Sequence, residues 1–130
     1  MSDLQQSLTI SASGMRAQAT RLRHVAENIA NADTPGYQRK LVPFEVAARR
    51  GEAAGTVRTG RVQLDTSDAN RIYDPSHPMA DADGYFTGSN VNSILEMADS
   101  REAQRGYEAN LKMFDQARKM SSSLLELLRR

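Results

Sequence analysis

Few side chains in this sequence have the types and spacing that catalysis needs, and its two histidines are the first candidates. His24 stands in a long helical pattern without further ligands at helical spacing, which favours a structural role over a metal site. His77 lies in a turn-rich segment, where Asp74 or Asp81 could assist it in a small hydrolase. No nucleophile elbow or triad signature frames these residues. We therefore predict no catalytic residue and no enzymatic activity.

Candidate ligand sites are equally weak. Residues 81–84 (Asp-Ala-Asp-Gly) resemble the start of a calcium loop, but Asn92 stands near the position where the distal glutamate is needed, so a turn-forming acidic loop is favoured. No glycine loop for phosphate is present. The basic pairs at 39–40 and 49–50 lack interleaved aromatic residues, which favours solvated faces over a nucleic-acid platform. We predict no metal, no cofactor and no nucleic-acid partner.

The composition sets wide limits. The chain has 130 residues, enough for one domain with long extensions, and 17 Lys+Arg against 16 Asp+Glu give a net charge of +1, which provides no strong electrostatic steering. Without cysteine it has neither disulfides nor thiolate metal sites. No apolar run approaches a membrane span of roughly 20 residues, and no basic and apolar leader opens the sequence. We therefore expect neither membrane insertion nor a cleavable signal peptide.

The apolar residues concentrate in two terminal stripes, and the first predicts a helix over residues 3–31. Alternate steps of four and three residues meet mostly apolar side chains, which indicates a narrow helical seam. Gly14 interrupts it at a cost of about 1 kcal/mol relative to alanine, so we expect dense packing there. The predicted interface of this helix consists of Leu4, Leu8, Met15, Leu22, Val25 and Ile29.

The second stripe predicts a helix over residues 91–129, with Asn90 or Asn92 as its N-cap. One seam follows Ala103, Gly106, Asn110, Met113, Ala117, Met120, Leu124 and Leu127, and Tyr107, Leu111, Phe114, Leu125 and Leu128 widen it. The two stripes could form the core of a single helical hairpin. Because each stripe is wide, a hairpin alone would leave apolar surface, which points to neighbours in an assembly. The predicted interface consists of Tyr107, Leu111, Phe114, Met120, Leu124, Leu127 and Leu128.

Residues 37–90 read as a small β-containing insert. Residues 41–46 suggest an extended piece interrupted by Pro43. Residues 57–64 read as a strand pair or hairpin of their own, and residues 71–73 as a further strand. The sequence thus divides into an N-terminal helix with its turn (1–36), the insert (37–90) and a C-terminal helix (91–130).

The most informative stretch is residues 26–37, which joins the first helix to an abrupt stop. Asn31 favours local side-chain hydrogen bonds over continued helix, and Thr34 precedes a proline. Pro35 and Gly36 suit the two central positions of a type II turn, where the second residue needs positive φ. The whole block resembles the N-terminal signature of bacterial flagellar axial proteins, those of the rod, hook and hook–filament junction. The residues that carry this resemblance are Asn28, Asn31, Thr34, Pro35, Gly36 and Tyr37.

A second block narrows the resemblance. Residues 73–92 (YDPSHPMADADGYFTGSNVN) are similar to the segment that distinguishes the proximal rod branch of that family. One departure is visible, because the family usually has a proline where Ser89 stands. With the length and both terminal helices, the resemblance covers nearly the whole chain.

The resemblance implies a structural subunit of the flagellar proximal rod. We expect a mainly α fold in which two long terminal helices pair as an antiparallel coiled coil around a small β-containing insert. Its partners would be itself, other flagellar rod proteins and the flagellar type III export apparatus, with no nucleic acid. It would reside in the basal-body rod across the periplasm, exported without a cleavable signal peptide. The alternative is a soluble helical-hairpin adaptor that binds a partner protein through its C-terminal stripe.

Overall fold

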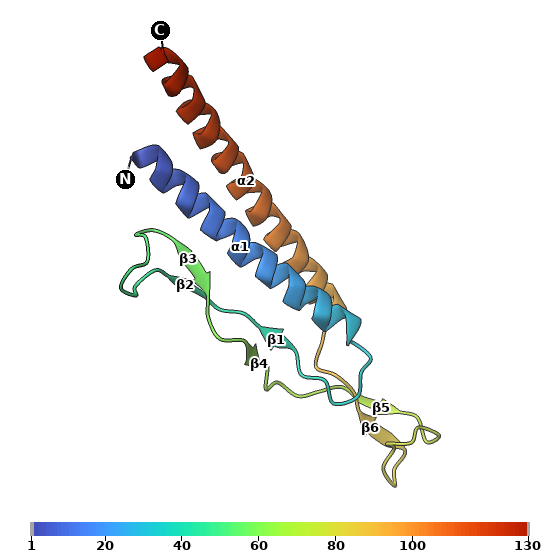
Figure 1. Cartoon of the computed structure of the whole chain (residues 1–130). Coiled ribbons are helices and arrows are strands. Elements are labelled where there is room, and N and C mark those ends of the chain that lie inside the picture. The colour runs from blue at the N-terminus through green and yellow to red at the C-terminus, as the bar shows by residue number, and fades with distance from the viewer. Residues whose placement is uncertain (1, 130) are drawn as a thin grey trace.

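The computed structural model describes residues 2–129, so Met1 and Arg130, the outermost residues of the predicted terminal segments, lie outside it. Two long helices, α1 (Asp3–Ala30) and α2 (Ser93–Arg129), flank six short strands (Figure 1). The strands are β1 (Lys40–Leu41), β2 (Phe44–Val46), β3 (Val57–Thr59), β4 (Gln63–Leu64), β5 (Arg71–Tyr73) and β6 (Tyr85–Thr87). The predicted mainly α fold with a β-containing insert is confirmed.

Local capping explains where both helices begin. The Ser2 hydroxyl accepts a hydrogen bond from Gln5 N at 3.2 Å and satisfies one of the free amides of the first turn of α1. Of the two candidates for the start of α2, Asn92 is the cap, since its Oδ1 accepts from Ile94 N at 3.1 Å. At the other end of α1, the backbone N–H of Asn31 donates to Glu27 O at 3.1 Å before the chain turns away.

The two helices pack side by side and run in opposite directions (Figure 1). Small residues are buried on both helices, with Gly14 on α1 and Ala103 and Ala117 on α2. The dense packing predicted at Gly14 is confirmed, because a Cβ there would lie 2.6 Å from Asn110 Oδ1. The C-terminal end of α2 extends beyond the start of α1 (Figure 1).

The insert forms three two-stranded antiparallel pairs: β1 with β4, β2 with β3, and β5 with β6. The prediction that residues 57–64 form a hairpin of their own is wrong, because both halves pair with residues 40–46 instead. The physical reason lies at Pro43 and Gly60. The proline has no N–H to give to a ladder, and Gly60 N donates to Pro43 O at 2.8 Å, which bridges the gap between the two pairs. The strand predicted at 71–73 is confirmed, and its partner β6 was not predicted.

The β1–β4 and β2–β3 pairs of the insert lie along α1 (Figure 1), and Arg39, next to β1, also reaches α2. Val57 N donates to the buried Ser13 hydroxyl at 3.1 Å, which ties β3 to the helix. The β5–β6 pair projects beyond the end of the helices (Figure 1). Since α1 contacts both α2 and the insert, the segment that leaves α1 fixes how the two halves of the molecule meet.

Candidate functional site: a helix-end junction and an exposed apolar surface

The predicted type II turn is present directly after α1. Gly36 has a φ of 75°, and Tyr37 N donates to Thr34 O at 3.2 Å, closing the turn around Pro35 and Gly36. The Thr34 hydroxyl donates to Asn31 Oδ1 at 3.1 Å. Gly36 N also donates to Gly88 O at 3.1 Å, so the turn contacts the segment that leads into α2. The turn brings Tyr37 back beneath the last turns of α1.

Asn28 is the centre of this junction. Its side chain is buried, and its amide nitrogen donates to Lys40 O at 3.0 Å and to Glu96 Oε2 at 3.3 Å. Its amide oxygen accepts from the Tyr37 hydroxyl at 2.8 Å and from Lys40 N at 2.9 Å. One side chain therefore uses its full donor and acceptor capacity to join α1, the turn, β1 and α2.

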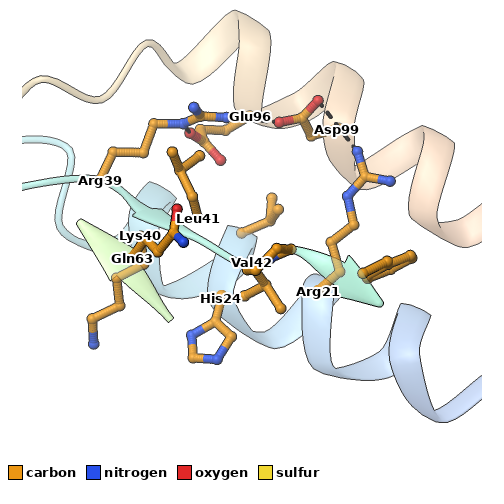
Figure 2. A pocket seen from close by; sticks show the side chains of 12 residues that line it. Arg21, His24, Arg39, Lys40, Leu41, Val42, Gln63, Glu96 and Asp99 are labelled. Atoms are coloured by element: carbon orange, nitrogen blue, oxygen red, sulfur yellow. Dashed lines mark hydrogen bonds and ion pairs between the residues drawn. The ribbon is translucent and has the colours of Figure 1, made fainter. Parts of the chain in front are cut away.

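Charged residues from both helices and the insert cluster beside Asn28, and Figure 2 shows Arg21, Arg39, Glu96 and Asp99 among them. Glu96 on α2 is fully buried and pairs with the Arg39 guanidinium, which also contacts Asp99 Oδ2 at 2.8 Å and Asp65 Oδ2 at 3.6 Å. Partial burial alone would lower the pKa of Arg39, but its pairing with Glu96, Asp99 and Asp65 raises that pKa above its ordinary value. Arg21 reaches Asp99 Oδ1 from α1 at 3.6 Å (Figure 2). A buried carboxylate needs such partners, because an unpaired charge in this position is strongly destabilising.

The basic pair at 39–40 is thus engaged within the molecule and is not the solvated face that we predicted. Lys40 pairs with Glu27 on α1. Their hydrogen bond raises the pKa of Lys40 and lowers the pKa of Glu27. Both charges of the basic pair therefore bind the insert to the helices.

The segment before α2 completes the junction. Asn90 Oδ1 accepts from Arg39 N at 2.6 Å, and Asn90 Nδ2 donates to Asp65 O at 2.9 Å. Ser89, which stands where the resemblance expects proline, is buried, and its hydroxyl donates to Ala32 O. The residues before α2 therefore hold both the end of α1 and the strands of the insert.

The side chains considered for chemistry lie apart from one another. His24 Nδ1 lies 3.5 Å from Glu27 Oε2, whereas the His77 ring stacks on Phe86 with 3.8 Å between ring centroids. Asp81 Oδ1 accepts from the backbone N–H of Tyr85 at 3.0 Å, and that hydrogen bond lowers the pKa of Asp81. Within residues 2–129 no three His, Cys, Asp or Glu side chains converge as metal ligands would. His77 and Asp81 therefore each have a local structural partner, whereas the buried His24 Nδ1 has no hydrogen-bond partner within residues 2–129.

The predicted interface residues divide into buried and exposed sets. On α1, Val25 is buried, Ile29 is exposed, and Leu4, Leu8, Met15 and Leu22 are half-buried. On α2 only Phe114 is half-buried; the exposed members are Tyr107, Leu111, Met120, Leu124, Leu127 and Leu128. Exposure rises toward the C-terminal end of α2, from 36% at Tyr107 to 82% at Leu128. We call the exposed members, Tyr107, Leu111, Met120, Leu124, Leu127 and Leu128, the α2 apolar surface. The rest of residues 2–129 leaves these apolar side chains uncovered, and contiguous exposed apolar residues are typical of interaction surfaces.

A groove adjoins the α2 apolar surface near the start of α1. Leu4 and Ile10 line it from α1, and Met113, Ala117 and Met120 line it from α2. Lys112 and Gln116 add polar edges. The two helices therefore present an apolar groove at the same end of the molecule where α2 extends beyond α1.

Comparison with known proteins matches this arrangement to a family. The profile described as flagella basal body rod protein matches residues 8–38, and that of the flagellar basal body rod FlgEFG protein C-terminal region matches residues 82–127. The flagellar basal-body rod protein FlgC of Agrobacterium fabrum is 41% identical over 99% of this chain and 98% of its own length. The chain belongs to the FlgC family of flagellar basal-body rod proteins.

More distant FlgC proteins align over most of their length as well. That of Salmonella typhimurium is 35% identical over 91% of this chain and 92% of its own, and that of Bacillus subtilis is 32% identical over 93% and 95%. The predicted flagellar resemblance is confirmed, and as a FlgC-family member this is a structural rod protein, not an enzyme. Neither helix, as far as the structure describes it, is long and apolar enough to cross a membrane.

The roles of several junction residues in this FlgC-family chain were not predicted from the sequence. Glu96 was not singled out, and Arg39 was predicted on a solvated face as part of the basic pair 39–40, because charged residues usually lie at the surface. A signal existed: Glu96 precedes the buried Ala103 by seven residues, so extending the predicted seam back by one heptad would have included it. The role of Asn90 as a bridge between Arg39, just before β1, and Asp65, just after β4, carried no comparable local signal.

Proposed function

We propose that this chain is a structural subunit of the flagellar proximal rod that polymerises through its terminal helices into a torque-transmitting tube. The α2 apolar surface is the observation that carries the proposal. Leu124, Leu127 and Leu128 are 51%, 63% and 82% exposed, although such side chains favour burial by roughly 1.5–3 kcal/mol each. A subunit in a packed tube would bury them against its neighbours.

The pairing of the helices that we propose is an antiparallel coiled coil. Its support is the heptad spacing of the residues at the contact, with Ala103, Asn110 and Ala117 seven residues apart on α2. The small side chains at this contact allow the two backbones to approach closely. Such a stiff pair suits a shaft that must carry torque without catalysis or cofactor.

The arrangement of apolar residues on α2 supports open-ended assembly. At 3.6 residues per turn, Tyr107 and Leu111 lie on one flank of the row that faces α1, and Met113 and Met120 lie on the other. Two different apolar flanks suit heterologous contacts, in which one flank of a subunit meets the opposite flank of the next. Contacts of this kind build helical filaments when the rotation does not close into a ring.

The remaining parts of the proposal follow from family membership. The partners would be further copies and other flagellar rod proteins, and export would use the flagellar type III apparatus without a cleavable signal peptide. The division at residues 1–36, 37–90 and 91–130 would then separate tube-forming helices from an outward-facing insert. In this proposal the junction around Asn28 sets the angle between them.

A complementation experiment tests heterologous assembly directly. Met113→Asp blocks one flank of α2 and Leu111→Asp blocks the other, while Lys119→Asp, which does not line the groove, is the matched exposed control. In sedimentation velocity over a concentration series, we expect the unaltered chain and the control to form growing oligomers. Each flank variant should stay monomeric alone, and an equimolar mixture should form dimers through the two intact flanks.

The adaptor alternative gives a different result. An adaptor that binds one partner through α2 would remain monomeric at every concentration, with or without the substitutions. Dimers that each flank variant forms alone would show an isologous contact and would contradict tube formation by this surface.

A further inference from the structure

Four residues at the middle of the helix contact form a reciprocal arrangement. A Cβ added to Gly14 of α1 would lie 2.6 Å from Asn110 Oδ1 of α2, and a Cβ added to Gly106 of α2 would lie 2.5 Å from Gln18 Nε2 of α1. Each helix therefore has a glycine four residues before an amide side chain. Because the helices run in opposite directions, each amide fills the space over the glycine of the other helix.

The two contacts are also joined to each other. Asn110 Nδ2 donates to the carbonyl oxygen of Gly106 at 2.8 Å, one turn back along α2. The Oε1 atom of Gln18 is buried, and no atom within residues 2–129 donates a hydrogen bond to it. A buried amide that leaves its oxygen unpaired is costly, so this layer is not explained by hydrogen-bond energy alone.

Elsewhere the contact consists of the Arg21 ion pairs with Asp99 and Glu102 near the junction and of small residues farther along. Ala103 and Ala117 are buried there, and a slip of one heptad would put Ala103 where Asn110 or Glu96 now lies. A slip of the glycine–amide layer would be costly. It would move Gln18 opposite Met113 in one direction or opposite Asp99 in the other, with no glycine beneath the amide. A single buried polar layer can select one register in this way, at some cost in stability.

We propose that Gly14, Gln18, Gly106 and Asn110 act as a register lock, a positioning device that fixes which turn of α2 lies against which turn of α1. The Asn28–Glu96 hydrogen bond holds the junction end of the hairpin in the same register. The register lock acts on the half away from that junction. There it sets how far α2 extends beyond the start of α1.

The consequence for the rod rests on the proposed function. If the extended end of α2 contacts neighbouring subunits, its length must be the same in every copy. The register lock itself concerns the isolated chain and is tested there, so its failure and the failure of rod assembly give different results.

The test measures register by a distance between two spin labels. The chain has no cysteine, so Arg23→Cys and Lys119→Cys, both at exposed positions, label one site on each helix. In the observed register these sites are offset by roughly 27 Å along the helix axes, and a one-heptad slip changes that offset by about 10 Å. Double electron–electron resonance on the full chain resolves such a change.

Replacing both amides with leucine removes the polar layer and keeps apolar volume at the contact. For Gln18→Leu/Asn110→Leu we expect an unfolding midpoint no lower than that of the unaltered chain, together with a broadened distance distribution and a second population displaced by about 10 Å. Gln5→Leu/Gln104→Leu removes two exposed amides from the same helices and is the matched control. A single narrow distance in the lock variant, equal to the control, would overturn the proposal.

Exchanging partners across the contact gives a second, independent test. Gly14→Asn places two amides in one space, and Asn110→Gly leaves a cavity, so each single variant should lower the unfolding midpoint and broaden the distance distribution. Gly14→Asn/Asn110→Gly restores one amide over one glycine from the opposite side. We expect the double variant to recover the single native distance. Additive damage in the double variant, with no recovery, would show that the four residues do not act as a lock.

Discussion

Removing the Asn28 side chain should cost far more than an ordinary polar substitution on a helix. Asn28→Ala leaves the N–H and C=O of Lys40, the Tyr37 hydroxyl and one contact of Glu96 without their partner. A buried group that loses its only partner costs about 1–3 kcal/mol. Glu96 keeps Arg39, and water can reach part of the junction, so we count two groups as unsatisfied. The expected loss is roughly 2–6 kcal/mol, a large share of a typical stability of about 5–15 kcal/mol.

The assay is denaturant unfolding of the purified full chain, followed by circular dichroism. Asn31→Ala is the matched control, because Asn31 belongs to the same motif but makes two local hydrogen bonds at a partly exposed site. We expect the control to lose about 1 kcal/mol. Equal losses in the two variants would show that Asn28 is not the centre of the junction.

A charged replacement of Asn28 changes its hydrogen bonds while keeping the size of its side chain. Asn28→Asp keeps the shape but replaces the donor to Glu96 with a second carboxylate, which like-charge repulsion disfavours. It should therefore be less stable than Asn28→Ala at neutral pH. Adding Glu96→Gln removes the repulsion and supplies a donor, so it should recover part of the loss. No recovery would mean that the Asn28–Glu96 contact contributes little.

Three further predictions follow from the turn, the end of α2 and the Glu27–Lys40 pair. In the same unfolding assay, Gly36→Val should destabilise the chain by about 1–3 kcal/mol and Gly36→Asn by less. The backbone alone sets this cost, because φ is 75° and no atom lies within 4 Å of an added Cβ. Leu124→Asp/Leu127→Asp should change the stability of the isolated chain by less than about 0.5 kcal/mol yet abolish swimming, since a charge in a dry interface costs several kcal/mol. The lowered pKa of Glu27 stabilises the folded chain above pH 4.5, and this contribution is lost as pH falls through the folded pKa. In Glu27→Gln the unfolding midpoint should therefore fall less steeply as the pH is lowered.

Each of these has a result that would contradict it. Equal stability of the Val and Asn variants at position 36 would show that positive φ is not the constraint. Normal swimming by the double leucine variant, with Ser122→Asp as the exposed control, would place the rod contact elsewhere. An unchanged acid limb in Glu27→Gln would assign the acid sensitivity to other carboxylates, of which Asp65 also has a lowered pKa, caused first by its backbone hydrogen bond with Ser67.

Features set by neighbouring residues were predictable from the sequence. The bounds of α1, the Asn92 cap and the turn at Gly36 each depend on side chains within about four positions of one another. Strand pairing was less accessible, because β3 and β4 pair with residues more than ten positions away and each contributes two or three residues. No alternating pattern of that length identifies its partner.

The junction could not be predicted from the sequence for a different reason. Each of its key side chains has a common local explanation: an asparagine near a helix end, a tyrosine after a turn and a glutamate in the first turn of α2. Their meaning comes from the fold, which brings Asn28, Tyr37 and Glu96 into one hydrogen-bonded group. The family resemblance marked Asn28 and Tyr37 as members of a motif, but only their geometry shows that one side chain joins four segments.

The row of α2 that faces α1 connects the junction, the register lock and the exposed end. It follows Glu96, Ala103, Asn110 and Ala117 at intervals of seven residues, and the next member is Leu124. The first four are buried or half-buried against the rest of the chain, whereas Leu124 is 51% exposed. In the register of the Gly14–Asn110 contact, its counterpart would lie before Asp3, where α1 begins. The same heptad that closes the hairpin therefore continues into a surface that the rest of residues 2–129 leaves exposed.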